Sequence, residues 1–281
     1  MGSGTNVLVP DPLFLRAMLA HDAYGREGDP AVVLLHGWPL NRGIWSQVAP
    51  LVAAAGFHVL CPDLPGFGGS APLDAARWTV EAYADEVAGF LEAASSGRAA
   101  VAGHSFGGYV ALALAERAPD RVAALGLVSS RTLADTDAGR AGRQATIEKV
   151  RAGGAAALSP DLPSKLLAPG AAADLRARGE ALIGACPPEA IVAGLTAMAA
   201  RPDRTGIFES FPRSLLVLHG SADQLIPVAE SPQPARQAGP MDRVVLDGVG
   251  HMPMWEDPAK TADGIVTWAR AAHGRAAASR P

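Results

Sequence analysis

Short, uninterrupted apolar runs alternate along this chain with longer segments whose apolar residues recur every three or four positions. The run over residues 31–36 is β-branched at its centre and is followed by Gly37, which is typical of a strand buried on both faces of a parallel sheet. We expect strands over six such runs, at residues 31–36, 57–61, 99–103, 122–128, 214–219 and 242–247.

The segments between these runs have the spacing of amphipathic helices. Val80, Tyr83, Val87 and Leu91 recur at helical intervals behind Thr79, a favoured N-cap residue. Helices are predicted over residues 41–55, 79–94, 106–117 and about 258–272. Strands that alternate with helices predict an α/β fold, with a mostly parallel, twisted sheet flanked by helices and joined by right-handed crossovers.

The alternation stops after Ser130. Residues 131–211 contain no strand-like run, only alanine-rich helical stretches interrupted by prolines. We expect this block to form a cap, because long insertions in such folds lie where ligands bind. The predicted organisation is a core of residues 12–130 and 212–273, an all-helical cap at residues 131–211, and a small, polar, disordered tail at residues 274–281.

Composition and charge narrow the range of partners. The 281 residues carry a formal net charge of −4 and no basic block, so we expect no nucleic-acid partner. No run approaches the roughly 18–20 apolar residues of a membrane span, and residues 1–11 lack the pattern of a signal peptide. Cys61 and Cys186 are expected to be free thiols, which favours a cytoplasmic protein. The expected partner is a small molecule, and the oligomeric state stays open.

A glycine-rich turn between a predicted strand and a predicted helix holds the first candidate catalytic residue. Residues 103–107 are Gly-His-Ser-Phe-Gly, with Ser105 at the centre. Gly-x-Ser-x-Gly between a strand and a helix is typical of a nucleophile elbow, where small neighbours leave room for a strained serine at a helix N-terminus. The alternative is a serine that only caps the helix.

Asp223 and His251 are the other two members of a candidate triad. Asp223 follows the strand predicted at residues 214–219, and His251 lies in a loop after the last predicted strand. Side chains just beyond strand ends point into the crevice where α/β sheets bind ligands. The chain order Ser, Asp, His is the order expected with an elbow serine. The alternatives are a helix-capping aspartate and a solvated histidine.

The loop after the first predicted strand is a candidate for half of an oxyanion hole. Its sequence is His36-Gly37-Trp38-Pro39. Acyl transfer needs two N–H donors aimed at the developing oxyanion. The N–H groups of Phe106, in the elbow, and Trp38 are the candidates, since Pro39 has no N–H. The alternative is an ordinary turn.

In these motifs the chain resembles the α/β-hydrolase superfamily, and most of all its small carboxylesterases and enol-lactonase-like enzymes with a helical cap. The resemblance rests on Gly-His-Ser-Phe-Gly-Gly, His-Gly-Trp-Pro and, around His251, Gly-His-Met-Pro. The stretch Met-Ala-Ala-Arg-Pro-Asp-Arg-Thr at residues 198–205 is similar to a cap-closing segment of those enzymes.

These observations predict a serine hydrolase that cleaves carboxylic esters of small, mainly apolar substrates through an acyl-enzyme, with no cofactor and no metal. Ser105 would be the nucleophile, His251 the base and Asp223 the orienting acid. Trp38, Phe106, Leu225 and Met252 are expected to line an apolar substrate site. A lactonase or a carbon–carbon bond hydrolase would use the same triad, and a non-catalytic ligand-binding protein on this scaffold is the alternative from another class.

The remaining histidines receive no catalytic role from the sequence. His36 and His104 lie in the motifs and are expected to pack and to form hydrogen bonds in their loops. The others belong to no recognisable constellation, namely His21, His58, His219 and His273.

Overall fold

The computed structural model describes residues 18–94, 98–159, 161–233 and 239–278. In this part of the chain seven strands form one sheet in the order β1-β3-β2-β4-β5-β6-β7. The strands are β1 (His21–Tyr24), β2 (Ala31–Leu35), β3 (His58–Pro62), β4 (Ala99–His104), β5 (Val122–Val128), β6 (Leu215–Gly220) and β7 (Met241–Leu246). Every neighbouring pair is parallel except β1 and β3, which confirms the predicted α/β fold.

Strand β1 is absent from the sequence prediction. Its four residues, His-Asp-Ala-Tyr, are mostly polar and only partly buried, so they form no apolar run. The strand pairs antiparallel with β3 at the edge of the sheet, where one side needs no partner strand.

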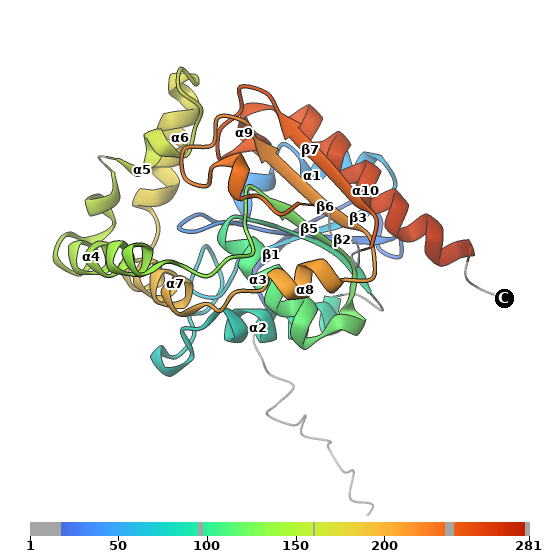
Figure 1. Ribbon diagram of the computed structural model, residues 1–281, viewed down its shortest axis with the longest axis horizontal. Helices are drawn as coiled ribbons and strands as arrows, with labels where there is room; N and C mark the ends of the chain where they lie inside the picture. Colours follow the sequence, from blue (N-terminus) through green and yellow to red (C-terminus); the bar gives the residue numbers. More distant parts are fainter. Residues whose placement is uncertain (1–17, 95–97, 160, 234–238, 279–281) are drawn as a thin grey trace, which may run out of the picture.

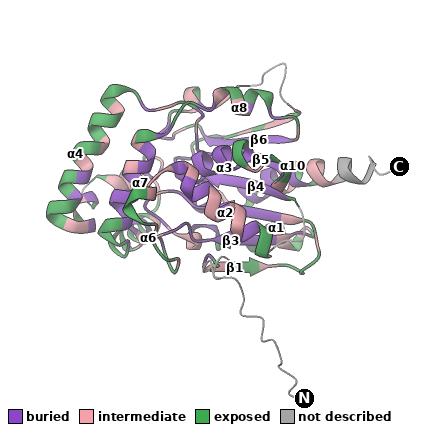
Figure 2. Cartoon of the chain, turned by 90° about the horizontal axis from the view of Figure 1, so that it is seen from below, coloured by how far each residue is buried: buried purple, intermediate pink, exposed green. Residues whose placement is uncertain are grey.

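Helices cover both faces of the sheet (Figure 1). Helix α1 (Ala49–Ala54) packs against α10 (Pro258–Ala278) on one face, and α2 (Val80–Ala94) packs against α3 (Phe106–Arg117) on the other. The central strands are buried almost throughout (Figure 2), as their apolar runs predict. Short elements complete the core: η3 (Ala75–Arg77), η4 (Pro119–Arg121), η6 (Val228–Glu230) and α9 (Pro253–Glu256).

The single helix predicted over residues 41–55 is wrong. The segment forms a 3₁₀ turn, η2 (Arg42–Trp45), and then the short α1. Asn41 caps η2 by accepting a hydrogen bond from the N–H of Gly43 at 2.9 Å. Pro50 has no N–H to donate, so a continuous helix would lose a hydrogen bond there, whereas α1 takes Pro50 into its first turn.

The segment between β5 and β6 is helical, as predicted. It contains α4 (Asp137–Gly153), η5 (Gly154–Leu158), α5 (Leu162–Lys165), α6 (Ala173–Gly184), α7 (Pro188–Ala200) and α8 (Thr205–Ser210). Helices α4 to α7 form a separate layer at the left of Figure 1, and we call this layer the cap. Helix α8 packs against α3 of the core, so the last part of the predicted cap lies on the core.

The ends of the chain bear on two further expectations. Residues 12–17 of the predicted core lie outside the described residues. Helix α10 extends to Ala278, past the start of the predicted disordered tail, and residues 279–281 also lie outside the described residues.

Cys61 and Cys186 are both free and buried. No single helix in the described ranges is long and apolar enough to cross a membrane, and only the bent pair α6 and α7 meets that test when counted together.

Candidate active site

Ser105 occupies the sharp turn between β4 and α3. Its backbone has φ 50° and ψ −112°, in the left-handed region that a serine adopts only when its surroundings enforce it. The N–H of Ser105 donates to the carbonyl of Val128 at 2.9 Å, and the hydroxyl of Ser130 donates to the carbonyl of Ser105 at 2.9 Å. Bonds from the neighbouring strand end therefore hold the strained residue from both sides.

The glycines of this turn are required by close backbone contacts. A Cβ atom on Gly103 would lie 2.1 Å from the carbonyl oxygen of Gly107, and one on Gly107 would lie 2.6 Å from that of His36. A Cβ on Gly37 would lie 3.2 Å from the Cβ of Ser105. The loop after β2 therefore passes directly beside the serine.

Asp223 and His251 meet across the ends of β6 and β7. Nδ1 of His251 donates to Oδ2 of Asp223 at 2.7 Å, and both side chains are buried. The other carboxylate oxygen, Oδ1, accepts the backbone N–H groups of Leu225 and Ile226, both at 2.9 Å. The carboxylate is thus held at both oxygens.

These contacts keep Asp223 ionised. Burial by itself would raise the pKa of Asp223, but the charge of His251 and the hydrogen bonds from His219, His251 and Ile226 hold that pKa well below its usual value. An ionised carboxylate at this position orients the imidazole of His251 and stabilises its protonated form.

His104 connects this pair to the elbow. Its ring lies 4.8 Å from the ring of His251, centroid to centroid, and its Nε2 donates to the backbone carbonyl of His251 at 2.9 Å. Burial and, next, the charge of His251 lower the pKa of His104 well below its usual value, so this ring is neutral. Ser105 directly follows His104 in the chain. His251 therefore contacts the residue that precedes the candidate nucleophile.

The two candidate oxyanion donors come from the elbow itself and from the loop that passes beside it. Phe106 is the first residue of α3, where a backbone N–H has no acceptor within the helix. Trp38 follows Gly37, the residue that passes beside Ser105. The indole Nε1 of Trp38 donates to the carbonyl of Ile191 in α7 at 3.0 Å, so the same residue also contacts the cap.

A cavity of about 330 Å³ lies between the cap and the core. Trp38 and Leu225, two of the four predicted substrate-binding residues, border it from the core. Phe106 and Met252, the other two candidates, are completely buried and are not among the described residues that line this cavity. The ring of Phe106 instead packs edge-on against Tyr83, with the centroids 5.1 Å apart.

The cap side of this cavity combines apolar and charged side chains. Its leucines come from η5, α5 and α7, and its cations come from α4 and α5. The residues are Leu158, Leu162, Leu195, Arg143, Lys149 and Lys165, with Asp161 as the one carboxylate among the described lining residues.

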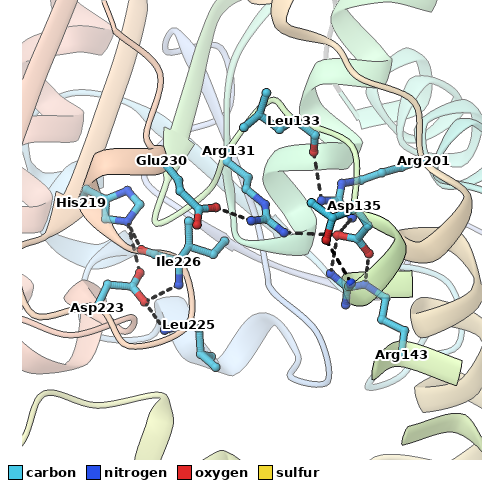
Figure 3. A network of polar contacts seen from close by, with 12 residues as sticks. Arg131, Leu133, Asp135, Arg143, Arg201, His219, Asp223, Leu225, Ile226 and Glu230 are labelled. Carbon is cyan, nitrogen blue, oxygen red and sulfur yellow. Dashed lines mark hydrogen bonds and ion pairs between the residues drawn. The ribbon is translucent and has the colours of Figure 1, made fainter. Parts of the chain in front are cut away.

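His219 is a site residue that the sequence analysis missed. Its Nε2 lies 3.2 Å from Oδ2 of Asp223 (Figure 3). Because His251 donates to the same oxygen, two imidazoles approach it. The sequence contained one signal, since His219 lies at the end of the strand that leads to Asp223. That position alone does not indicate whether the side chain turns toward the carboxylate.

Figure 3 also shows a buried ionic cluster beside the site. Asp135, whose side chain is 1% exposed, pairs with Arg131, Arg143 and Arg201, and Arg131 also pairs with Glu230. Arg201 belongs to the segment whose sequence is similar to a cap-closing stretch. Within the described ranges, no group of three or more His, Cys, Asp or Glu side chains is arranged to hold a metal ion.

The comparison with known families identifies the class of protein. Residues 30–258 match the family model described as the alpha/beta hydrolase fold. The chain therefore belongs to the α/β-hydrolase family, as its motifs and its sheet indicate.

Several of the individual relatives are esterases. The chain is 33% identical over 241 residues to a pimeloyl-[acyl-carrier protein] methyl ester esterase of Methylococcus capsulatus, covering 83% of this chain and 92% of that protein. It is 31% identical to a thermophilic esterase from Thermogutta terrifontis, with a TM-score of 0.85 over 91% of this chain and 94% of the other. The enol-lactonase from Burkholderia xenovorans LB400, at 21% identity and a TM-score of 0.78 over 89% of this chain and 95% of the other, shares the fold.

Proposed function

We propose that this protein is a serine hydrolase that cleaves carboxylic esters through an acyl-enzyme. The observation that carries the proposal is the strained turn at Ser105 beside a buried Asp223–His251 pair whose bond measures 2.7 Å. A serine held in the left-handed region beside a histidine with an ionised carboxylate partner is the arrangement that nucleophilic acyl transfer requires. The esterase relatives support the same reaction class.

In the first half-reaction, Oγ of Ser105 attacks the ester carbonyl carbon while its proton passes to Nε2 of His251. The tetrahedral intermediate collapses, the C–O bond to the alcohol breaks, and His251 returns the proton to the leaving alkoxide. In the second half-reaction His251 takes a proton from water, the resulting hydroxide attacks the acyl carbon, and the acid leaves as Ser105 is reprotonated.

The backbone N–H groups of Trp38 and Phe106 would hold the oxyanion of both tetrahedral intermediates. The position of Phe106 at the start of α3 supports this role, because the N-terminus of a helix favours negative charge. The approach of Gly37 to Ser105 supports the role of Trp38. Removing one such donor in comparable enzymes lowers kcat by about 10²–10³-fold.

The cavity under the cap is the proposed site for the acyl or alcohol part of the substrate. Trp38 and Leu225, together with the cap leucines, suit an apolar chain of short to medium length, as expected. Trp38 carries one candidate oxyanion N–H, and Leu225 donates a backbone hydrogen bond to Asp223. Both core residues of the cavity are therefore directly linked to the proposed catalytic groups.

A second candidate substrate class is an ester whose far end carries a negative charge. Lys149 and Lys165 on the cap side of the cavity favour it, because cations there complement a carboxylate or phosphate. Comparing kcat/KM for the monomethyl and dimethyl esters of one dicarboxylic acid separates the two classes, since only the monoester keeps the charge.

A fluorophosphonate probe and p-nitrophenyl esters test the proposal. We expect the wild-type protein to be labelled at Ser105 and to hydrolyse short esters, whereas Ser105→Ala should lose labelling and at least about 10⁴-fold in kcat. Ser210→Ala, at an exposed serine of α8, is the matched control and should keep both activities.

Two results would contradict parts of the proposal. Turnover by Ser105→Ala within tenfold of wild type would exclude Ser105 as the nucleophile. A folded wild-type protein that neither reacts with the probe nor hydrolyses any ester would favour the non-catalytic binding protein. A panel of lactones and of substrates with cleavable carbon–carbon bonds distinguishes the hydrolases that share this triad.

A further inference from the structure

The carboxylate of Asp223 has a second imidazole partner besides His251. His219 lies in β6, and its side chain is completely buried. Its Nε2 is 3.2 Å from Oδ2 of Asp223 and 2.8 Å from the carbonyl oxygen of Ile226 (Figure 3). Oδ2 is also the oxygen that accepts the hydrogen bond from His251.

These contacts determine where His219 carries its proton. The carboxylate of Asp223 and the carbonyl of Ile226 are both acceptors, so Nε2 must carry the hydrogen. Nδ1 of His219 is buried and has no hydrogen-bond partner among the described residues. Protonating Nδ1 would bury an N–H donor without an acceptor, which is unfavourable. The contacts therefore favour a neutral ring that donates only from Nε2.

We propose that His219 is a positioning residue for the Asp223–His251 pair, a neutral donor that orients the carboxylate and limits the negative charge that Oδ2 presents to His251. The inference rests on the proposed function, in which His251 is the base. A hydrogen bond to the charged form of a carboxylate stabilises that form and withdraws charge from it. Without the donor, Asp223 would stabilise the imidazolium of His251 more strongly, and His251 would lose its proton at higher pH.

The other titratable groups around the pair come from three elements. His104 at the end of β4 contacts His251, and His36 beyond the end of β2 is near His104. Glu256 in α9 accepts the N–H groups of Gly250 at 3.0 Å and Ala168 at 2.9 Å. None of these groups is a hydrogen-bond partner of Nε2 of His219 in the described part of the chain, so a substitution of His219 acts on Asp223 through the lost donor and through the carbonyl of Ile226, whose N–H also donates to Asp223.

Two variants test the inference through the pH dependence of kcat/KM for a p-nitrophenyl ester. His219→Leu removes the donor at similar bulk, and we expect the acid limb to move up by about 0.5–1 pH unit with a roughly tenfold loss of kcat. His219→Gln can place an amide N–H near the former Nε2, and we expect it to return the limb toward the wild-type pH. A purely structural role would lower kcat without moving the limb.

A folded His219→Leu protein with the wild-type acid limb would overturn the inference. A second measurement covers the case in which that variant does not fold. Nitrogen-15 NMR of the histidine rings in the wild-type protein at pH 7.5 should show His219 as the Nε2–H tautomer. An Nδ1–H tautomer would also overturn it. The NMR measurement needs no turnover. It therefore separates failure of this inference from failure of the proposed function, which would appear as absent labelling of Ser105 by the fluorophosphonate probe.

Discussion

Gly103 is required by its neighbours rather than by its own backbone angles. A Cβ atom at this position would lie 2.1 Å from the carbonyl oxygen of Gly107 and 2.4 Å from the amide nitrogen of Gly108. These are backbone atoms of the first turn of α3, so no side-chain rotation can relieve the contact. Helix α3 would have to move away from β4, and Ser105 lies between the two elements.

Gly103→Ala is therefore expected to damage both stability and turnover. Overpacking of this kind lowers the free energy of unfolding by about 1–3 kcal/mol, and misplacement of a catalytic group by about 1 Å lowers kcat/KM by about 100-fold. Urea denaturation and hydrolysis of a p-nitrophenyl ester measure the two effects.

Gly184→Ala is the matched control for this substitution. Gly184 is the last residue of α6, and a Cβ atom there has no atom within 4 Å. We expect unchanged turnover and a free energy of unfolding that is unchanged or raised by up to about 1 kcal/mol. Wild-type turnover in Gly103→Ala would show that the position of Ser105 does not depend on this contact.

At the scale of elements, one buried carboxylate joins the cap to the core. Asp135 pairs with Arg143 of α4, with Arg201 after α7 and with Arg131 after β5. The guanidinium of Arg201 also lies 4.1 Å from the ring centroid of Tyr109 in α3. Burial opposes ionisation of Asp135, but Arg143 and Arg201 hold its pKa below the usual value. The negative charge of Asp135 therefore neutralises arginines from both the cap and the core.

Asp135→Asn should destabilise the protein strongly, because it leaves buried guanidinium groups without their counter-ion. Breaking a buried ion pair from one side typically lowers the free energy of unfolding by about 3–5 kcal/mol. Asp137→Asn is the matched control, since Asp137 forms an exposed pair with Arg140 and exposed pairs contribute little. Equal thermal midpoints for the two variants would contradict a structural role for the cluster.

At the scale of the whole molecule, buried neutral histidines make stability depend on pH. Nδ1 of His36 donates to the carbonyl of Gly37 at 3.0 Å, and its Nε2 accepts the N–H of Leu64 at 2.8 Å. These two bonds require the neutral ring. Burial, the largest effect, accordingly lowers the pKa of His36, and burial also lowers the pKa of His104.

The sign of the pH effect follows from these shifts. The unfolded chain binds protons at these histidines as the pH falls through about 6.5, whereas the folded chain does not. The free energy of unfolding should fall below that pH by up to about 1.4 kcal/mol per pH unit for each such histidine. Glu256, whose pKa burial raises, acts in the opposite direction at more acidic pH.

Urea denaturation of the wild-type protein and of His36→Gln between pH 5.5 and 7.5 measures this dependence. We expect the free energy of unfolding to change less steeply with pH in the variant, because the variant lacks one histidine that binds a proton on unfolding. Identical slopes would mean that His36 has the same proton affinity in the folded and unfolded chains.

The elements that the sequence predicted correctly are those whose signal is local. Six of the seven strands in the described chain were predicted from short runs, and five of these, β2 to β6, are buried almost throughout. The glycines around Ser105 marked a turn with close backbone contacts. β1 was missed because an edge strand of mixed polarity has no such run. The helix over residues 41–55 was overextended because it was predicted from the spacing of apolar residues, which takes no account of Pro50.

The order of residues alone determined the alternation of strands and helices, the helical insertion and the local motifs around Ser105, Asp223 and His251, because each depends on near neighbours in the chain. Tertiary structure decided which side chains meet. It placed His219 on Asp223, turned the ring of Phe106 into the core, and gathered arginines from three segments around Asp135. These contacts join residues from separate elements, and they depend on how strands and helices pack, which no short stretch of sequence specifies.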